Sequence, residues 1–262
     1  MPHFKRNAPA RDKSYMYGKH ALREALENAP RVIKKVFFAP EMDDRALRDL
    51  VRSRNIPISE LKRREAGRIV GEETPHQGVI AVANLDLLMV DFDDFIETAN
   101  ISADTMLVLL DELTDPQNVG AIIRSAAAFG AAGVLMPLHN QAPLTGAVVK
   151  ASAGMVFRVP VIAIGNVNLT IDRLRDRGFR AYALAMQGPK TVSEEVYDAP
   201  SLFIVGNEGK GIRQKTFEHC DVTLRIPMHP RCESLNASVS AAVALYAWSE
   251  KHPNSLAPAT SS

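Results

Sequence analysis

The sequence predicts an α/β protein with a small front domain and a larger domain built on a parallel sheet. Two patterns support this prediction. Short helical and strand-like segments alternate over 14–85, and longer, continuously apolar strand segments alternate with helical ones over 104–251. With 262 residues, 46% of them hydrophobic, the chain is long enough for two such units.

The remaining segments are expected to lie outside the two domains. Residues 1–13 are basic and lack the apolar stretch of a secretory signal, so we expect a flexible arm. Residues 86–103 are acidic with weak periodicity and predict a linker with a lead-in helix. The polar residues 252–262 predict a disordered tail.

In the front domain, apolar periodicity and helix-capping residues define the elements. Apolar residues between Tyr17 and Leu26 recur at helical spacing, Pro40 ends a strand, and Asp43 and Asp44 can cap the next helix. The expected elements are helices over 17–28, 43–55 and 61–70 and strands over 34–40, 56–60 and 78–85.

The larger domain shows buried strands separated by helices. Because ligands of such sheets bind beyond the carboxyl ends of the strands, functional residues are expected in the loops 111–118, 183–190, 205–211 and 226–236. The expected strands are 105–111, 133–137, 158–164, 179–185, 201–206 and 222–227, and the expected helices follow Asp115 and cover 145–154, 168–178, 211–220 and 236–251.

The helix after the first of these loops has a defined start and end. Asp115 can cap it, Pro116 suits its first position, and Gly130 can end it. Gly120 and Arg124 share one face, where a glycine allows close approach and a guanidinium suits a phosphate or ribose oxygen. A packing glycine and a surface arginine explain this pattern equally well.

The loop at 205–211 is rich in glycine but matches neither familiar nucleotide loop. Gly206, Gly209 and Gly211 have the wrong spacing for the dinucleotide fingerprint, which disfavours an oxidoreductase. Ile212 and Arg213 stand where a P-loop needs lysine followed by serine or threonine. A flexible backbone remains, able to bind a nucleoside through main-chain groups.

Beyond 226–236, Ser234 and Asn236 are good N-caps for the last helix, and capping alone could explain them. The free amides of that helix start could instead meet a ligand carboxylate or phosphate. The helix is apolar on nearly all sides, which predicts burial in a core or in an interface between subunits.

Charge and cysteine content limit the function classes. The net charge is only +1, but basic residues concentrate in the first 70. This concentration indicates either a surface that binds a polyanion or a solvated helix face. No apolar run reaches the roughly 20 residues of a membrane helix. The two cysteines, Cys220 and Cys232, lack metal-ligand spacing, so we expect no metal and a reduced, cytoplasmic setting.

Taken together, DPQNVGAIIRSAAAFG, FIVGNEGKGI and IPMHPRCESLNASVSAAVALY resemble the three motifs of the SpoU (TrmH) family of RNA ribose 2′-O-methyltransferases, in the SPOUT superfamily. The segments MYGKHALREALENAPRVIKKVFFAP and TPHQGVIAVA are similar to the L30e-like substrate-binding domain of the rRNA-directed members. The resemblance covers about 14–250 and is strongest to the members that methylate a guanosine of 23S rRNA. One departure is Pro230, which stands where the family often has glycine, so we expect the loop to differ in shape from the family pattern there.

The resemblance implies a trefoil-knotted catalytic domain, a homodimer, S-adenosylmethionine as cofactor and RNA as partner. By position in the motifs, it implies that Gly206, Ile226 and Leu235 hold the cofactor and that Asn118, Arg124, Glu208, Ser234 and Asn236 form the catalytic cluster. Arginine stays protonated in proteins, so we expect Arg124 to hold the ribose and its phosphate rather than act as the base. We expect Glu208 to orient Arg124 or Asn118.

Three alternatives stay open at this point. One is a tRNA 2′-O-methyltransferase, although the tRNA enzymes of this family usually lack the front domain. Another is a resistance-type enzyme that modifies a different rRNA site. The third is a non-catalytic RNA-binding factor in ribosome assembly, against which the intact motif residues argue.

Overall fold

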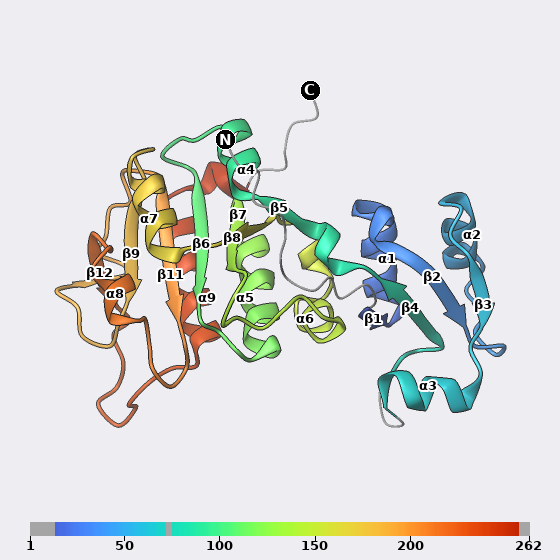
Figure 1. Ribbon diagram of the computed structural model, residues 1–262. Helices are drawn as coiled ribbons and strands as arrows, with labels where there is room; N and C mark the ends of the chain where they lie inside the picture. Colours follow the sequence, from blue (N-terminus) through green and yellow to red (C-terminus); the bar gives the residue numbers. More distant parts are fainter. Residues whose placement is uncertain (1–13, 72–74, 257–262) are drawn as a thin grey trace. The chain divides into compact units, whose positions relative to one another are not determined.

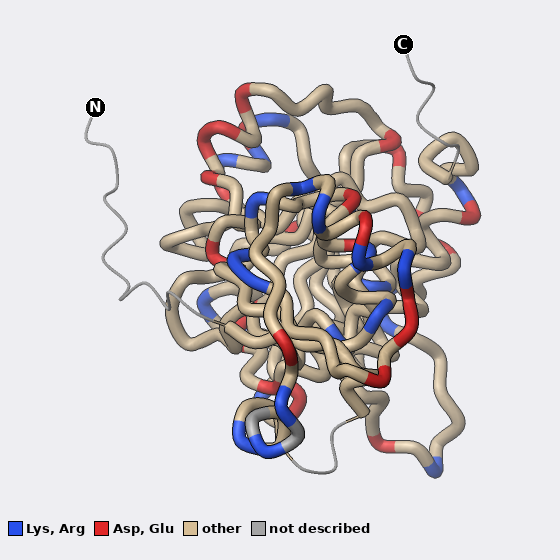
Figure 2. The backbone as a smooth tube through the Cα atoms, turned by 90° about the vertical axis from the view of Figure 1, so that its right-hand side faces the viewer, with Lys and Arg blue, Asp and Glu red and all other residues tan. Residues whose placement is uncertain are grey.

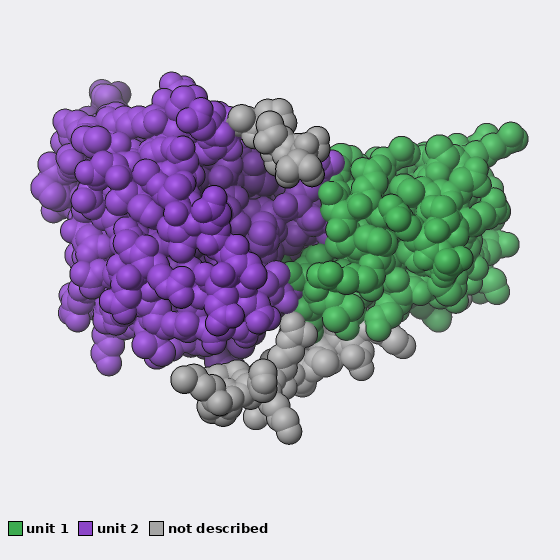
Figure 3. Space-filling view, turned by 90° about the horizontal axis from the view of Figure 1, so that it is seen from above, with its two compact units in different colours: residues 1–88, 144–146 green, residues 89–143, 147–262 purple. Residues whose placement is uncertain are grey.

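The computed structural model describes residues 14–71 and 75–256. The chain divides into two compact units, 1–88 with 144–146 and 89–143 with 147–262 (Figure 3). The expected basic arm, 1–13, lies outside the described residues. The prediction of a disordered tail over 252–262 is wrong for its first residues, because His252 is buried and Pro253–Leu256 form a 3₁₀ helix; residues 257–262 lie outside the described residues.

The first unit is a four-stranded sheet in the order β1-β4-β2-β3, in which only the β2–β3 pair is parallel (Figure 1). Its strands are β1 Ser14–Tyr17, β2 Ile33–Phe38, β3 Ile58–Glu60 and β4 Val79–Ala83. Its helices are α1 Lys19–Asn28, α2 Arg45–Ser53 and α3 Arg63–Val70, with short 3₁₀ helices at Pro30–Val32 and Leu85–Leu88.

Local chemistry explains where these elements begin. The Asp44 carboxylate accepts a hydrogen bond from the Leu47 amide at 3.0 Å and caps α2, as predicted. The predicted helix start at Tyr17 is wrong, because Tyr17 ends β1. Gly18, at φ 96°, turns the chain from that strand into α1.

The second unit holds an eight-stranded sheet in the order β10-β12-β9-β11-β6-β7-β8-β5, and every pair in it is parallel. The α/β fold with a parallel sheet is therefore confirmed. The strands are β5 Met89–Asp91, β6 Met106–Asp111, β7 Gly133–Pro137, β8 Val161–Ile164, β9 Arg180–Leu184, β10 Lys190–Thr191, β11 Ser201–Gly206 and β12 Val222–Arg225. The helices are α4 Phe92–Thr98, α5 Pro116–Ala128, α6 Gly146–Ala151, α7 Val167–Arg175, α8 Gln214–Phe217 and α9 Ala237–Ser249.

Three elements of this unit differ from the sequence prediction. The segment 86–103, expected to be a linker with a lead-in helix, supplies the edge strand β5, which pairs with β8; its expected helix is confirmed as α4. The two-residue strand β10 has no counterpart in the prediction. The helix expected over 211–220 is reduced to α8, because the chain up to Arg213 belongs to the glycine-rich loop.

Helices cover the two faces of this sheet. On one face, α4 and α7 pack with the strands through Phe92, Ile96, Ile171 and Leu174. On the other, α5 and α9 pack against each other, and α9 reaches β11 through Trp248, whose indole donates to Ser201 at 3.0 Å. Strands β6, β7 and β11 are almost wholly buried, so their carboxyl ends form a fixed platform for loops. The trefoil knot stays a prediction of the resemblance.

Candidate active site

The first two motif loops leave the sheet side by side. Strands β6 and β11 are parallel neighbours, and their last residues, Asp111 and Gly206, are in register. The loop after β6 leads into α5, where Asp115 caps the helix by accepting from the Gln117 amide at 2.8 Å. The predicted start of this helix is therefore confirmed, and so is its end near Gly130, which has φ 77°.

Asn118 links all three motif segments. Its side-chain amide donates to the Glu208 carboxylate at 2.5 Å and to the Asp115 carboxylate at 3.3 Å. Its carbonyl oxygen accepts from the Asn236 side-chain amide at 2.9 Å. The side chain of Asn118 is thus fully engaged and only 7% of the residue is exposed. Three residues of the expected catalytic cluster, Asn118, Glu208 and Asn236, lie within one hydrogen-bond network.

Asn236 also caps the last helix. Its Oδ1 accepts from the Ser238 amide at 2.8 Å and the Val239 amide at 3.3 Å. The capping interpretation is confirmed for Asn236 but not for Ser234, whose side chain is exposed and caps no helix. With one side chain, Asn236 therefore fixes the start of α9 and attaches it to α5.

The glycine-rich loop folds back on itself directly after β11. Asn207 and Gly211 exchange two backbone hydrogen bonds, at 3.1 and 2.8 Å. A Cβ on Gly206 would lie 2.4 Å from backbone atoms of Gly211 and Ile212. The loop can close this tightly only because position 206 has no side chain.

A cavity of about 790 Å³ opens beside this loop. Gly206, Ile226 and Leu235, the residues expected to hold the cofactor, all line it, and so do Glu208 and Ser234. Asn118, Asn236 and Arg124 are not among its lining residues. Residues of the second and third motif segments thus line the same cavity.

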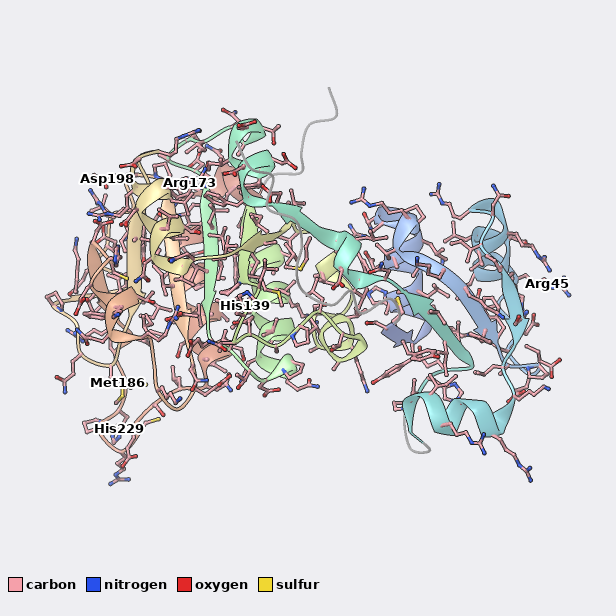
Figure 4. All side chains as sticks on the ribbon, in the orientation of Figure 1. Arg45, His139, Arg173, Met186, Asp198 and His229 are labelled. Atoms are coloured by element: carbon pink, nitrogen blue, oxygen red, sulfur yellow. The ribbon has the colours of Figure 1, made fainter. Side chains whose placement is uncertain are left out.

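Several lining residues were not singled out from the sequence. Leu184 ends β9, and Ala185 and Met186 follow it in the loop; the sequence predicts a functional loop at this strand end but no particular residue in it. Met228 also contributes and lies in the predicted functional loop 226–236, whereas Phe217 carries no sequence signal beyond being apolar. Met186 and His229 lie at the same end of the unit, opposite Arg173 and Asp198 (Figure 4).

Arg124 stands apart from the network. Its side chain is exposed and makes no hydrogen bond or ion pair with any residue that the structure describes. Gly120, one turn earlier, is a packing glycine: a Cβ there would lie 2.4 Å from the Ala151 Cβ and 2.8 Å from the Val148 carbonyl oxygen. For Gly120 the structural interpretation is right, whereas Arg124 keeps a free guanidinium.

The loop with Pro230 adopts a turn without glycine. Pro230 and Arg231 occupy it, and the Cys232 amide donates to the His229 carbonyl at 2.8 Å. All four residues are exposed. The departure from the family pattern therefore lies on the solvent side of the loop.

Other kinds of chemistry lack support at this site. Burial, followed by the charges of Asp221 and Asp111, raises the pKa of the Cys220 thiol to about 12, so it is no nucleophile at neutral pH. Over 14–71 and 75–256, no three metal-binding side chains come together. Within the same ranges, no helix has both the length and the apolar character to cross a bilayer.

Known proteins share both units. Residues 105–246 match the SpoU rRNA methylase family, and residues 15–86 match a domain described as RNA 2′-O ribose methyltransferase substrate binding. A protein of Mycobacterium avium (strain 104), named as an uncharacterized tRNA/rRNA methyltransferase, is 36% identical over 87% of this chain and 74% of its own length. The 23S rRNA (guanosine-2′-O-)-methyltransferase RlmB of Pseudomonas syringae pv. tomato is 33% identical over 88% of this chain and 93% of its own.

The fold is also found among solved structures. The SpoU methyltransferase AviRb from Streptomyces viridochromogenes, crystallised with the cofactor AdoMet, superimposes with a TM-score of 0.79 at 23% identity, over 92% of this chain and 91% of AviRb. Fold and sequence together define an RNA methyltransferase. The chain belongs to the SpoU rRNA methylase family and carries the substrate-binding domain of the RNA 2′-O ribose methyltransferases.

Proposed function

We propose that this protein transfers a methyl group from S-adenosylmethionine to the ribose 2′-oxygen of a guanosine in 23S rRNA. The observation that carries this proposal is the joining of the three motif segments, through Asn118, Glu208 and Asn236, beside a cavity at the carboxyl ends of parallel strands. The name of the Pseudomonas relative, which matches over nearly the whole of both chains, supports the choice of substrate.

The cavity suits S-adenosylmethionine in size and in chemistry. Its volume of about 790 Å³ lies in the usual range for ligand pockets. Leu184, Ile226 and Leu235 supply apolar walls for an adenine ring, and the backbone around Gly206 supplies amide and carbonyl groups for its polar edge. These residues hold the cofactor mainly through shape and main-chain groups.

The chain's own groups have two tasks in the reaction. Bound S-adenosylmethionine supplies a methyl group on a sulfonium, which is already a strong leaving group. The protein must therefore align the ribose 2′-hydroxyl with the methyl group and allow the proton of that hydroxyl to be removed. Arg124 holds the ribose and its phosphate and stabilises the developing oxyanion, and a phosphate oxygen or a water accepts the proton.

Glu208 acts on the reaction through Asn118. Its carboxylate is the nearer of the two carboxylates that accept from the Asn118 amide, at 2.5 Å against 3.3 Å for Asp115, and the Asn118 carbonyl is then oriented toward Asn236. No hydrogen bond or ion pair joins Glu208 to Arg124 within the described ranges. Of the two partners expected for Glu208, we therefore assign it to Asn118.

The front unit supplies affinity for RNA. Exposed basic residues gather on α3 and the turn before it, at Lys62, Arg64 and Arg68 (Figure 2). Neutralising all three is expected to weaken RNA binding and to flatten its salt dependence, by about one unit of slope for each RNA phosphate that is no longer neutralised. An unchanged salt slope would place the RNA on another surface.

A homodimer is supported by the exposed side of α9. Val239 and Tyr246 lie seven residues apart on this helix, on one face, and are 47% and 51% exposed. Exposed apolar residues in such a row are typical of a surface that a second protein covers. We propose that a second copy of this chain covers this face of α9.

A methylation assay tests the proposed function. Purified protein is mixed with S-adenosylmethionine carrying a labelled methyl group and with either 23S rRNA or tRNA, and the RNA is digested and analysed by mass spectrometry. We expect 2′-O-methylguanosine in 23S rRNA alone. Label in tRNA alone would support the tRNA alternative, and binding of RNA without transfer would support a non-catalytic factor.

A further inference from the structure

Arg213 follows the glycine-rich loop and is attached to a buried carboxylate. Asp111, the last residue of β6, is fully buried. The Arg213 amide donates to Asp111 Oδ2 at 3.1 Å, its Nε donates to Oδ1 at 2.9 Å, and its Nη2 lies 2.6 Å from Oδ1. The sequence alone assigns Arg213 no role beyond excluding a P-loop.

Glu112 provides a second attachment for the same loop. Its carboxylate lies 3.2 Å from Arg213 Nη1, and its carbonyl oxygen accepts from the Asn207 side-chain amide at 3.0 Å. Glu112 itself has φ 60°, a left-handed backbone conformation that is uncommon for residues other than glycine. Both flanks of the loop, Asn207 and Arg213, are thus fixed to the end of β6: Asn207 to Glu112, which follows the strand, and Arg213 to Glu112 and to Asp111, the last strand residue.

The part of the loop between these attachments lines the cavity. Asn207 Oδ1 accepts from the Gly209 and Lys210 amides at 3.0 and 3.2 Å, which closes the loop into a small hairpin. Glu208 sits inside this hairpin and receives the hydrogen bond of Asn118. The position of Glu208 and of the cavity wall therefore depends on where the two flanks are held.

We propose that Arg213 is a positioning residue, which holds the glycine-rich loop in the shape that binds S-adenosylmethionine and places Glu208 against Asn118. This inference rests on the proposed function. A loop with Gly206, Gly209 and Gly211 has many conformations available, and a ligand that must order it binds less tightly. An ordinary surface ion pair would have little effect, but the Asp111 carboxylate is buried and takes three donors from one arginine.

The test compares three single variants of the full-length protein. Arg213→Gln removes the charge and the paired donors, and Arg213→Lys keeps the charge without the two-pronged geometry. Lys215→Gln is the matched control, because Lys215 is an exposed basic residue of α8 that does not line the cavity. The double variant Asp111→Asn with Arg213→Gln keeps the test decisive if the single variant unfolds, since it leaves no unpaired buried carboxylate.

Calorimetric titration with S-adenosylmethionine and steady-state kinetics are the measurements. For Arg213→Gln we expect the KM and Kd for S-adenosylmethionine to rise at least about tenfold, the loss expected when hydrogen bonds to a charged group are removed. Arg213→Lys should recover part of this, and the KM for RNA should stay within about twofold, as in the Lys215→Gln control. Equal cofactor affinity in Arg213→Gln and the control would overturn the inference.

The same titration separates this inference from the proposed function. If the wild-type protein binds S-adenosylmethionine and every Arg213 variant binds it equally well, only the positioning role is wrong. If the wild-type protein binds none, the proposed function itself fails and the positioning role fails with it.

Discussion

Replacing Asn118 with aspartate is expected to disable the protein without changing the volume of the side chain. The amide that donates to Glu208 at 2.5 Å becomes a second carboxylate oxygen, and the donor to Asp115 at 3.3 Å is removed with it. A hydrogen bond to a charged group contributes about 1.5–3 kcal/mol. Repulsion between the carboxylates adds to this loss, reduced by solvent because Glu208 is exposed.

A net effect of about 2–3 kcal/mol on the transition state corresponds to a fall in rate of about 30- to 150-fold. The assay is single-turnover methyl transfer to 23S rRNA at saturating S-adenosylmethionine, with thermal melting to verify folding. Asn254→Asp is the matched control, because it adds the same charge at an exposed residue outside the site. That control should keep full activity.

A second substitution tests the pairing directly. In the double variant Asn118→Asp with Glu208→Gln, the donor and the acceptor exchange places and the net charge returns to that of the wild type. We expect the rate to recover to within about tenfold of wild type, because the remaining defect is local to Asp115, where a hydrogen bond is lost and two carboxylates face each other. A double variant no more active than Asn118→Asp alone would refute the role assigned to this hydrogen bond.

Three further substitutions address other parts of the molecule. Arg124→Lys should lose most activity while it keeps cofactor affinity, because lysine cannot hold a phosphate with two parallel donors, and full activity would reject this role. Gly120→Ala should lower the free energy of unfolding by about 1–3 kcal/mol, since its Cβ would meet Ala151 at 2.4 Å, and an unchanged melting temperature would contradict the packing role. Val239→Asp should halve the molecular mass measured by light scattering, and an unchanged mass would place the subunit interface elsewhere.

The sequence was most informative where structure is determined locally. The buried strands follow from continuous apolar runs, and the caps at Asp115 and Asn236 follow from residue type beside an apolar period. Tyr17 fits a helical period as well as a strand, and its pairing with Ile80 of β4, together with the positive φ at Gly18, places it in the strand. Strand β5 is not predicted from the sequence, because three residues are too few to show the alternation of a strand.

The site could be predicted only through the order of its motifs. Asn118 lies 90 residues from Glu208 and 118 from Asn236, so no local pattern indicates that their side chains touch. The family resemblance grouped these residues, and the structure adds which atom donates to which. The pairing of Arg213 with Asp111 spans 102 residues and involves none of the expected site residues. Such pairings depend on strand order, which periodicity does not determine.

The central claim is methylation of one guanosine ribose in 23S rRNA, and the most direct measurement is a map of 2′-O-methylated nucleotides in cells with and without this protein. We expect a single 2′-O-methylguanosine of 23S rRNA to disappear on deletion and to return with the wild-type chain but not with Arg124→Lys. An unchanged 23S rRNA map, or a methyl group missing from tRNA instead, would contradict the claim.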